Sequence, residues 1–142
     1  MGSFTREEFN TGLSRLSIFS LSLLKDRLPD LREVALKQAD DLYFFAFRFL
    51  KEHSSQRLVP LRIALSTFGI ILADYPHTQN FINFMNNHQT TYKGINSDQW
   101  NMFFVFSKNV DPDLRNYSDE NAWPVILDDF VTFMREQKLV SK

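Results

Sequence analysis

Few residues in this sequence have the type and spacing that catalysis or metal binding requires. The three histidines, His53, His77 and His88, are too far apart in the chain to form a helical metal pair at i, i+3 or i, i+4, so we expect them in loops or at the surface. No Cys is present, which excludes thiol nucleophiles, disulfides and Cys-ligated metals. The four Gly are scattered rather than gathered in a phosphate-binding loop. We therefore expect no catalytic residue, no metal site and no cofactor.

Two pairs of adjacent carboxylates are the remaining candidates for acid–base chemistry. They are Asp40 with Asp41 and Asp128 with Asp129. Neighbouring residues on an α-helix point about 100° apart, so neither pair forms a dyad by spacing alone, and we expect both pairs on solvated polar faces. Asp98 is an acid in the first turn of an expected helix, where a negative charge complements the helix dipole.

Length and composition indicate one globular domain with a real core. The chain has 142 residues, of which 44% are hydrophobic, and its net charge of −1 gives no general surface for nucleic acid. Apolar stretches are much shorter than the ~20 residues of a membrane span, and the N-terminus lacks a secretory pattern. We expect a cytoplasmic or nuclear protein. The 15 Phe against 4 Gly favour helices, because strand-rich folds need many glycine-containing turns.

The first expected helix has a clear start. Thr5 and Glu8 have the spacing of a capping box, in which each side chain binds the other residue's backbone N–H. Phe4 and Phe9 flank the cap at the positions of a hydrophobic staple. The N-terminus of this helix is therefore predicted at Thr5.

The next segments are also expected to be helical. A short helix is predicted over residues 20–28 and should end at Pro29, because proline lacks the backbone N–H that a helix interior needs. Residues 31–53 are predicted to be helical, with a break near Asp40. The aromatic run over residues 42–50 could also be a buried strand, but it lies in a longer stretch without Gly or Pro, which favours a central helix.

The second half of the chain has four further helix starts. Pro60 suits the first turn of one helix, and Thr78 can cap the next. Residues 96–99 form a second capping box, and Pro124 suits the first turn of the last helix. Together the pattern predicts an all-α fold in which residues 1–142 form a single compact bundle of about seven helices.

The C-terminal quarter carries a specific motif. Residues 116–131 read NYSDENAWPVILDDFV. This run resembles the signature near the end of the potentiating-neddylation (PONY) domain of the defective-in-cullin-neddylation family, which is centred on an Ala-Trp-Pro block. Residues 96–100, 42–51 and 4–16 are similar to further segments of that domain. The resemblance covers about residues 4–135 and is weak over residues 59–91.

The resemblance implies a helical ligase component without catalytic residues. Members of the family bind the C-terminal winged-helix region of a cullin and the conjugating enzyme that carries the neddylation modifier. Holding both partners raises their effective concentration and orients the thioester, which accelerates transfer without an acid, base or nucleophile on the scaffold.

The family's cullin-binding surface is a patch of two aspartates and an alanine. By the resemblance it falls on Asp98, Ala122 and Asp128. Two carboxylates can pair with Lys or Arg on a basic cullin surface, and a small residue allows close approach. Trp123 is a plausible support for the patch or simply a core residue.

The family's second surface is a hydrophobic pocket for the acetylated N-terminal Met of the conjugating enzyme. By the resemblance its positions here are Phe4, Phe9, Phe49 and Ile70. The similarity begins part-way into the family's domain, so we expect this chain to lack the N-terminal helices that supply much of the pocket. The chain is then either a fragment or a naturally short member with an incomplete pocket.

Two alternatives to a neddylation-promoting scaffold remain open. A shortened relative could bind a cullin without the conjugating enzyme and so compete with active members. A helical carrier could use the Phe-rich interior as a ligand pocket, but that needs convergent polar groups that the sequence does not show.

Overall fold

The computed structural model describes residues 3–88 and 91–140. Over these residues the fold is mostly helical, with seven helices and two strands of three residues each. The helical prediction is therefore confirmed, whereas the two short strands were not predicted. The chain divides into two compact units, Met1–Glu52 and His53–Lys142, and each is described by itself.

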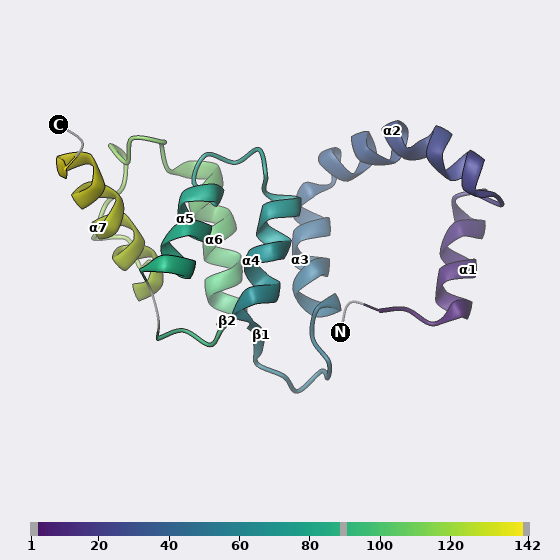
Figure 1. Ribbon diagram of the computed structural model, residues 1–142, viewed down its shortest axis with the longest axis horizontal. Helices are drawn as coiled ribbons and strands as arrows, with labels where there is room; N and C mark the ends of the chain where they lie inside the picture. Colours follow the sequence, from purple (N-terminus) through teal and green to yellow (C-terminus); the bar gives the residue numbers. More distant parts are fainter. Residues whose placement is uncertain (1–2, 89–90, 141–142) are drawn as a thin grey trace. The chain divides into compact units, whose positions relative to one another are not determined.

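The first unit contains helices α1 (Arg6–Arg15), α2 (Leu21–Lys37) and α3 (Ala39–Phe49) (Figure 1). The predicted capping box at the start of α1 is confirmed. The Glu8 backbone N–H donates to Thr5 Oγ1 at 3.1 Å, and the Thr5 N–H donates to Glu8 Oε2 at 2.7 Å. The rings of Phe4 and Phe9 lie next to each other with centroids 6.1 Å apart, as a staple requires.

The prediction that Pro29 ends the second helix is wrong, because α2 continues through this residue to Lys37. Ser20 caps its start, accepting a hydrogen bond from the Leu23 N–H at 3.1 Å. A proline inside a helix removes one backbone hydrogen bond, but α2 has no buried residue, so solvent can satisfy the freed carbonyl. The break before α3 lies at Gln38, close to the predicted position.

The aromatic run is helical as far as Phe49, where α3 ends, so the prediction of a helix up to residue 53 is wrong at its end. The run is only partly a core element. Tyr43, Ala46 and Phe47 are buried, whereas Phe44 and Phe45 are exposed. Neither α1 nor α2 contains a buried residue. The first unit therefore presents most of its apolar side chains on its surface.

The second unit contains helices α4 (Leu61–Ile71), α5 (Thr78–Asn87), α6 (Ser97–Asn109) and α7 (Val125–Val140). Strands β1 (Leu58–Pro60) and β2 (Gly94–Asn96) pair antiparallel at one end of the helices (Figure 1). Val59 lies opposite Ile95, and both are buried. A Cβ on Gly94 would lie 2.5 Å from the Val59 carbonyl oxygen, so this pairing requires glycine.

Aromatic rings form the core of the second unit. Phe68 on α4 packs against Trp100 and Phe103 on α6, with centroids 4.6 and 4.8 Å apart. Phe81 on α5 packs against Phe103 at 4.2 Å and meets Phe130 on α7 edge-on at 5.3 Å. All five rings are buried, so α4, α5, α6 and α7 share one apolar core.

The helix starts in this unit were predicted with mixed success. The capping box of α6 is confirmed, since the Gln99 N–H donates to Asn96 Oδ1 at 2.8 Å and the Asn96 N–H donates to Gln99 Oε1 at 3.0 Å. The prediction that Thr78 caps α5 is wrong. Thr78 is the first residue of α5, His77 precedes it, and the Thr78 hydroxyl is buried with no hydrogen-bond partner in the described part of the chain.

Candidate functional site

The Ala-Trp-Pro segment before α7 is anchored by its tryptophan. The Trp123 ring is nearly parallel to the Tyr117 ring, at 6.1 Å and 18°, and meets the Phe106 ring on α6 edge-on at 5.6 Å. The backbone N–H of Trp123 donates to the Asn121 carbonyl at 2.8 Å. Phe106 also packs edge-on against Phe130 of α7. Phe106 thus connects α6 both to this segment and to α7.

A hydrogen bond joins Tyr117 to α7. The Tyr117 hydroxyl donates to Oδ1 of Asp128, which is half-buried in the first turn of the helix. Burial raises the pKa of Tyr117, and the hydrogen bond to Asp128 and its negative charge raise this pKa further. The phenol therefore keeps its proton through the neutral pH range and remains a donor to the carboxylate.

Arg135 contacts the ring of the same tyrosine. Its guanidinium carbon is 5.5 Å from the centroid of the Tyr117 ring, within the range of a cation–π contact. Its Nη1 is 3.9 Å from Oδ1 of Asp119. Both side chains of that ion pair are exposed, so the pair contributes only about 0–1 kcal/mol. Tyr117 therefore contacts both a carboxylate, which accepts its hydroxyl, and a cation, which lies near its ring.

The adjacent carboxylates of α7 lie in different surroundings, because neighbouring residues on a helix point about 100° apart. Asp128 accepts the Tyr117 hydroxyl. Asp129 is exposed. The pKa of Tyr92 is raised mainly by burial of its phenol and to a smaller extent by the negative charge of Asp129. The expectation of a solvated face therefore fits Asp129 but not Asp128, which is half-buried.

The three residues predicted to bind a cullin lie at two helix starts of the second unit. Asp98 is exposed in the first turn of α6. Ala122 is exposed just before α7, and Asp128 follows in its first turn. Trp123 lies between Ala122 and Asp128 in the sequence. Its ring supports the segment by packing against Phe106 of α6.

The chain around Ala122 and Asp128 is strongly acidic, although the net charge of the whole protein is only −1. Between positions 111 and 129, six acids stand against a single Arg, which is Arg115. The acids are Asp111, Asp113, Asp119, Glu120, Asp128 and Asp129. A surface of this sign attracts a basic partner and accelerates its association.

Three of the four residues predicted for the conjugating-enzyme pocket form one aromatic cluster in the first unit. The ring of Phe4 stacks on Phe9 at 6.1 Å and on Phe49 at 5.7 Å, and Phe49 also stacks on Phe45 at 5.4 Å. Ile70 belongs to the second unit, where 78% of its surface on α4 is exposed.

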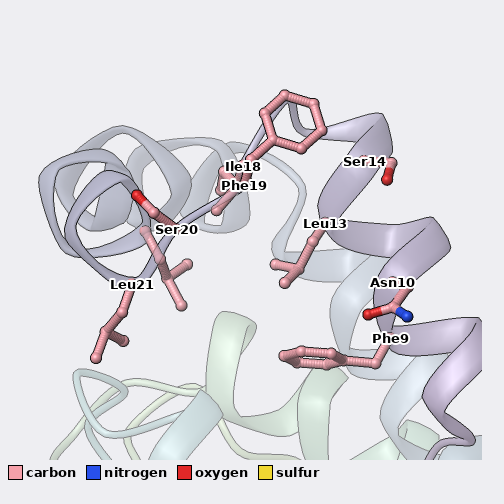
Figure 2. A pocket seen from close by; sticks show the side chains of 9 residues that line it. Phe9, Asn10, Leu13, Ser14, Ile18, Phe19, Ser20 and Leu21 are labelled. Carbon is pink, nitrogen blue, oxygen red and sulfur yellow. The ribbon is translucent and has the colours of Figure 1, made fainter.

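Two apolar hollows flank α1 within the first unit. The larger, of about 440 Å³, lies between α1 and the start of α2, and Phe9 and Leu13 project from α1 into it (Figure 2). Its other lining residues include Ile18, Leu21 and Leu24. The second hollow, of about 300 Å³, also includes Phe9 and Leu13 in its lining, together with these four: Phe4, Glu8, Gly12 and Leu16.

The sequence prediction for this region included only part of the lining. Phe9 was named, but Leu13, Ile18 and Leu21 were not assigned to the pocket. For Leu13 and Leu21 the signal was present in the apolar spacing of α1 and α2, whereas Ile18 lies in the turn between these helices. The α1–α2 turn that joins the faces includes Ser17 at φ 56°, a conformation that sequence spacing does not reveal.

His77 lies in the turn that precedes α5, within the prediction of a loop or surface position, but it is not at the surface. His77 is buried, its Nε2 lies 2.9 Å from the Val110 carbonyl oxygen, and its ring packs against Phe106 at 4.9 Å. His53 and His88 are exposed, as expected. His77 therefore has a packing role at the start of α5.

The described residues offer neither a metal cluster nor a membrane span. In residues 3–88 and 91–140, no three His, Asp or Glu side chains gather where a metal ion could be held. None of the helices described combines the length and the hydropathy that a membrane span requires.

Comparison with known proteins identifies relatives over nearly the whole chain. DCN1-like protein 2 of Dictyostelium discoideum is 36% identical over 143 residues, covering 99% of this chain and 53% of the relative. DCN1-like protein 3 of Homo sapiens is 36% identical over 144 residues, covering 97% and 47%. DCN1-like protein 4 of Danio rerio is 36% identical over 143 residues, covering 98% and 50%. The chain thus spans about half the length of these relatives.

A family model described as "Cullin binding" matches residues 23–133. The match begins in the first turn of α2 and ends within α7, and it contains all three residues predicted to bind a cullin. The chain belongs to the cullin-binding family of DCN1-like proteins.

Proposed function

We propose that this chain binds the C-terminal winged-helix region of a cullin through Asp98, Ala122 and Asp128. It promotes neddylation of that cullin by holding the charged conjugating enzyme nearby. The observation that carries the proposal is the acidic segment before and within α7. There the Tyr117 hydroxyl donates to Asp128, and Ala122 is exposed. Family membership and the local excess of acids support the same partner.

The proposed mechanism is proximity rather than chemistry on this chain. Bringing the modifier thioester and the cullin lysine together converts a bimolecular encounter into an effectively unimolecular step. The scaffold then needs two binding surfaces and no catalytic acid, base or nucleophile. The aromatic cluster of Phe4, Phe9 and Phe49 and the larger hollow beside α1 supply the surface for the conjugating enzyme in this proposal.

Calorimetry against a cullin winged-helix domain tests the cullin-binding half. Replacing Asp128 by Lys should weaken binding tenfold or more, because like charges would then face each other at the centre of contact. Tenfold corresponds to about 1.4 kcal/mol. The control is Asp74→Lys, which makes the same charge change at an exposed position between α4 and α5. No binding by the parent chain, with a cooperative melt, would contradict the proposal.

A transfer assay tests the second half. The chain should raise the rate at which charged conjugating enzyme delivers the modifier to the cullin. Cullin binding without this acceleration would instead support the competitor, in which the chain occupies the cullin and blocks active relatives. Failure of cullin binding together with saturable uptake of a small apolar ligand would support the ligand carrier.

A further inference from the structure

The contact between Tyr117 and Asp128 has a consequence for recognition. Asp128 is the half-buried member of the patch, and one oxygen of its carboxylate accepts the Tyr117 hydroxyl. An aspartate side chain on a helix otherwise turns among several rotamers, and each rotamer aims the charge in a different direction. A single charge-assisted hydrogen bond from a fixed phenol selects one of them.

The tyrosine is itself fixed from three directions. Only 7% of Tyr117 is exposed, its ring lies against Trp123 at 6.1 Å, and the Arg135 guanidinium covers it at 5.5 Å. A turn places it there, since its N–H donates to the Leu114 carbonyl at 3.3 Å and Leu114 has φ 64°. The donor is therefore held before any partner arrives, and ordering it costs nothing at the moment of binding.

We infer that Tyr117 is a positioning residue for the cullin contact: its hydroxyl holds the Asp128 carboxylate in the direction in which a partner lysine or arginine approaches. This inference rests on the proposed function and adds a residue outside the patch itself. Tyr117 contributes no charge to the surface and acts through Asp128.

The neighbouring carboxylate supplies a contrast within the same helix turn. Asp129 carries the same charge one position later, but it is exposed, and adjacent side chains point about 100° apart around the helix. If only the total negative charge of this segment mattered, the two aspartates would be interchangeable. If direction matters, Asp128 should dominate, and its effect should depend on Tyr117.

The principal variant is Tyr117→Phe, which removes the hydroxyl and keeps the stacked ring. With the cullin winged-helix domain as the probe, we expect its dissociation constant to rise about three- to tenfold, since a hydrogen bond to a charged group is lost. Because the net charge is unchanged, the association rate and its salt dependence should stay the same, and the dissociation rate should rise. The matched control is Tyr75→Phe, whose half-buried ring packs on Phe104, and which should bind like the parent.

A double-mutant cycle separates positioning from a general structural effect. Adding Tyr117→Phe to Asp128→Asn should weaken binding no further, because the hydroxyl then has no carboxylate to orient. Asp129→Asn removes the same charge and should retain the full Tyr117→Phe effect. Asp128→Glu keeps the charge but moves the carboxylate, so it should also weaken binding.

The outcomes distinguish this inference from the proposed function. If the parent chain does not bind the cullin domain, both fail. If the parent binds and Asp128→Lys abolishes binding, but Tyr117→Phe binds like the parent, the proposed function stands and the positioning role is overturned. An equal loss for Tyr117→Phe in the parent and in Asp128→Asn would also overturn it. Should Tyr117→Phe not fold, the binding of Asp128→Glu decides, since parent-like affinity would overturn the inference.

Discussion

The indole of Trp123 and the phenol of Tyr117 lie nearly parallel, 6.1 Å apart between centroids. The two residues are six positions apart in the loop that precedes α7. The stack joins the two ends of this stretch of the loop, and the indole also packs nearly at right angles to the Phe106 ring of α6. The start of α7, where Asp128 lies, is therefore fixed by aromatic packing as well as by the helix itself.

Removing the indole should destabilise the second unit. Trp123→Ala is expected to lower the free energy of unfolding by about 2–4 kcal/mol, since it removes the stack on Tyr117 and the edge contact with Phe106. Trp123→Phe should cost less than the lost area suggests. The Trp123 Nε1 is buried without a hydrogen-bond partner in the described part of the chain, and phenylalanine removes that unpaired donor.

Urea unfolding followed by circular dichroism measures these changes. Phe19→Ala is the control, because 77% of the surface of Phe19 is exposed. It should change the free energy of unfolding by no more than about 0.5 kcal/mol. A parent-like midpoint for Trp123→Ala would show that the stack contributes nothing to the fold.

Stability should fall in alkaline solution. The pKa values of Tyr117 and Tyr43 are raised in the fold, for Tyr43 by burial and for Tyr117 by burial and then by Asp128. A tyrosine in the unfolded chain has a pKa of about 10, so the folded state binds the phenol proton more tightly than the unfolded state does. The resulting stabilisation is complete below pH ~10 and is lost as the pH rises from there toward the folded pKa.

Unfolding midpoints measured from pH ~8 to pH ~11 check this sign. The parent should lose stability above pH ~10, and Tyr117→Phe should lose it less steeply, because one raised group is gone. Tyr43→Phe should reduce the slope in the same way. A slope unchanged in both variants would contradict the assignment of these two phenols.

Features set by local sequence were predicted well. Both capping boxes form because each depends on two side chains three residues apart, with no help from the rest of the fold.

Two other local signals, at Thr78 and Pro29, failed. Thr78 has the right residue type for a cap, but it is the first helical residue and its hydroxyl is buried. Pro29 failed as a stop signal because the rule concerns a lost hydrogen bond, and an exposed helix tolerates that loss.

Features that depend on distant residues were missed. The strands are three residues long and pair across 36 positions, so neither has a periodic pattern of its own. The bond from Tyr117 to Asp128 spans eleven positions and depends on the turn at Leu114. Tyr117 stood in the family motif, but nothing in the sequence said which carboxylate it would reach. His77 lies in a turn, but its burial was missed, because the rings that pack against it come from α6 and α7.

Asp98 has two possible roles that can be separated. As an acid in the first turn of α6 it stabilises the helix dipole by about 0.3–1 kcal/mol, and as a patch residue it contacts the cullin. Asp98→Asn should lower stability by no more than this and should still weaken cullin binding several-fold. Asn96→Ala removes the cap of the same helix, and it should lower stability by about 1 kcal/mol without changing the affinity. Equal binding by Asp98→Asn and the parent would leave Asp98 with the dipole role alone.

Phe9 tests the surface for the conjugating enzyme, because it lines both hollows beside α1 and stacks on Phe4. A peptide of the enzyme's N-terminus, acetylated on its Met, should bind the parent chain. It should bind Phe9→Ala at least tenfold more weakly, since the apolar contact of a whole ring is lost. Phe44→Ala removes a ring of similar exposure from α3 that lines neither hollow, and it should leave the peptide affinity unchanged.

Fluorescence anisotropy gives the dissociation constants of the peptide for the parent chain and for both variants. The unacetylated peptide shows whether burial of the charged amine opposes binding. Equal losses in the two alanine variants would mean that the peptide does not use the hollows beside α1, and a chain that still bound cullin would then fit the competitor.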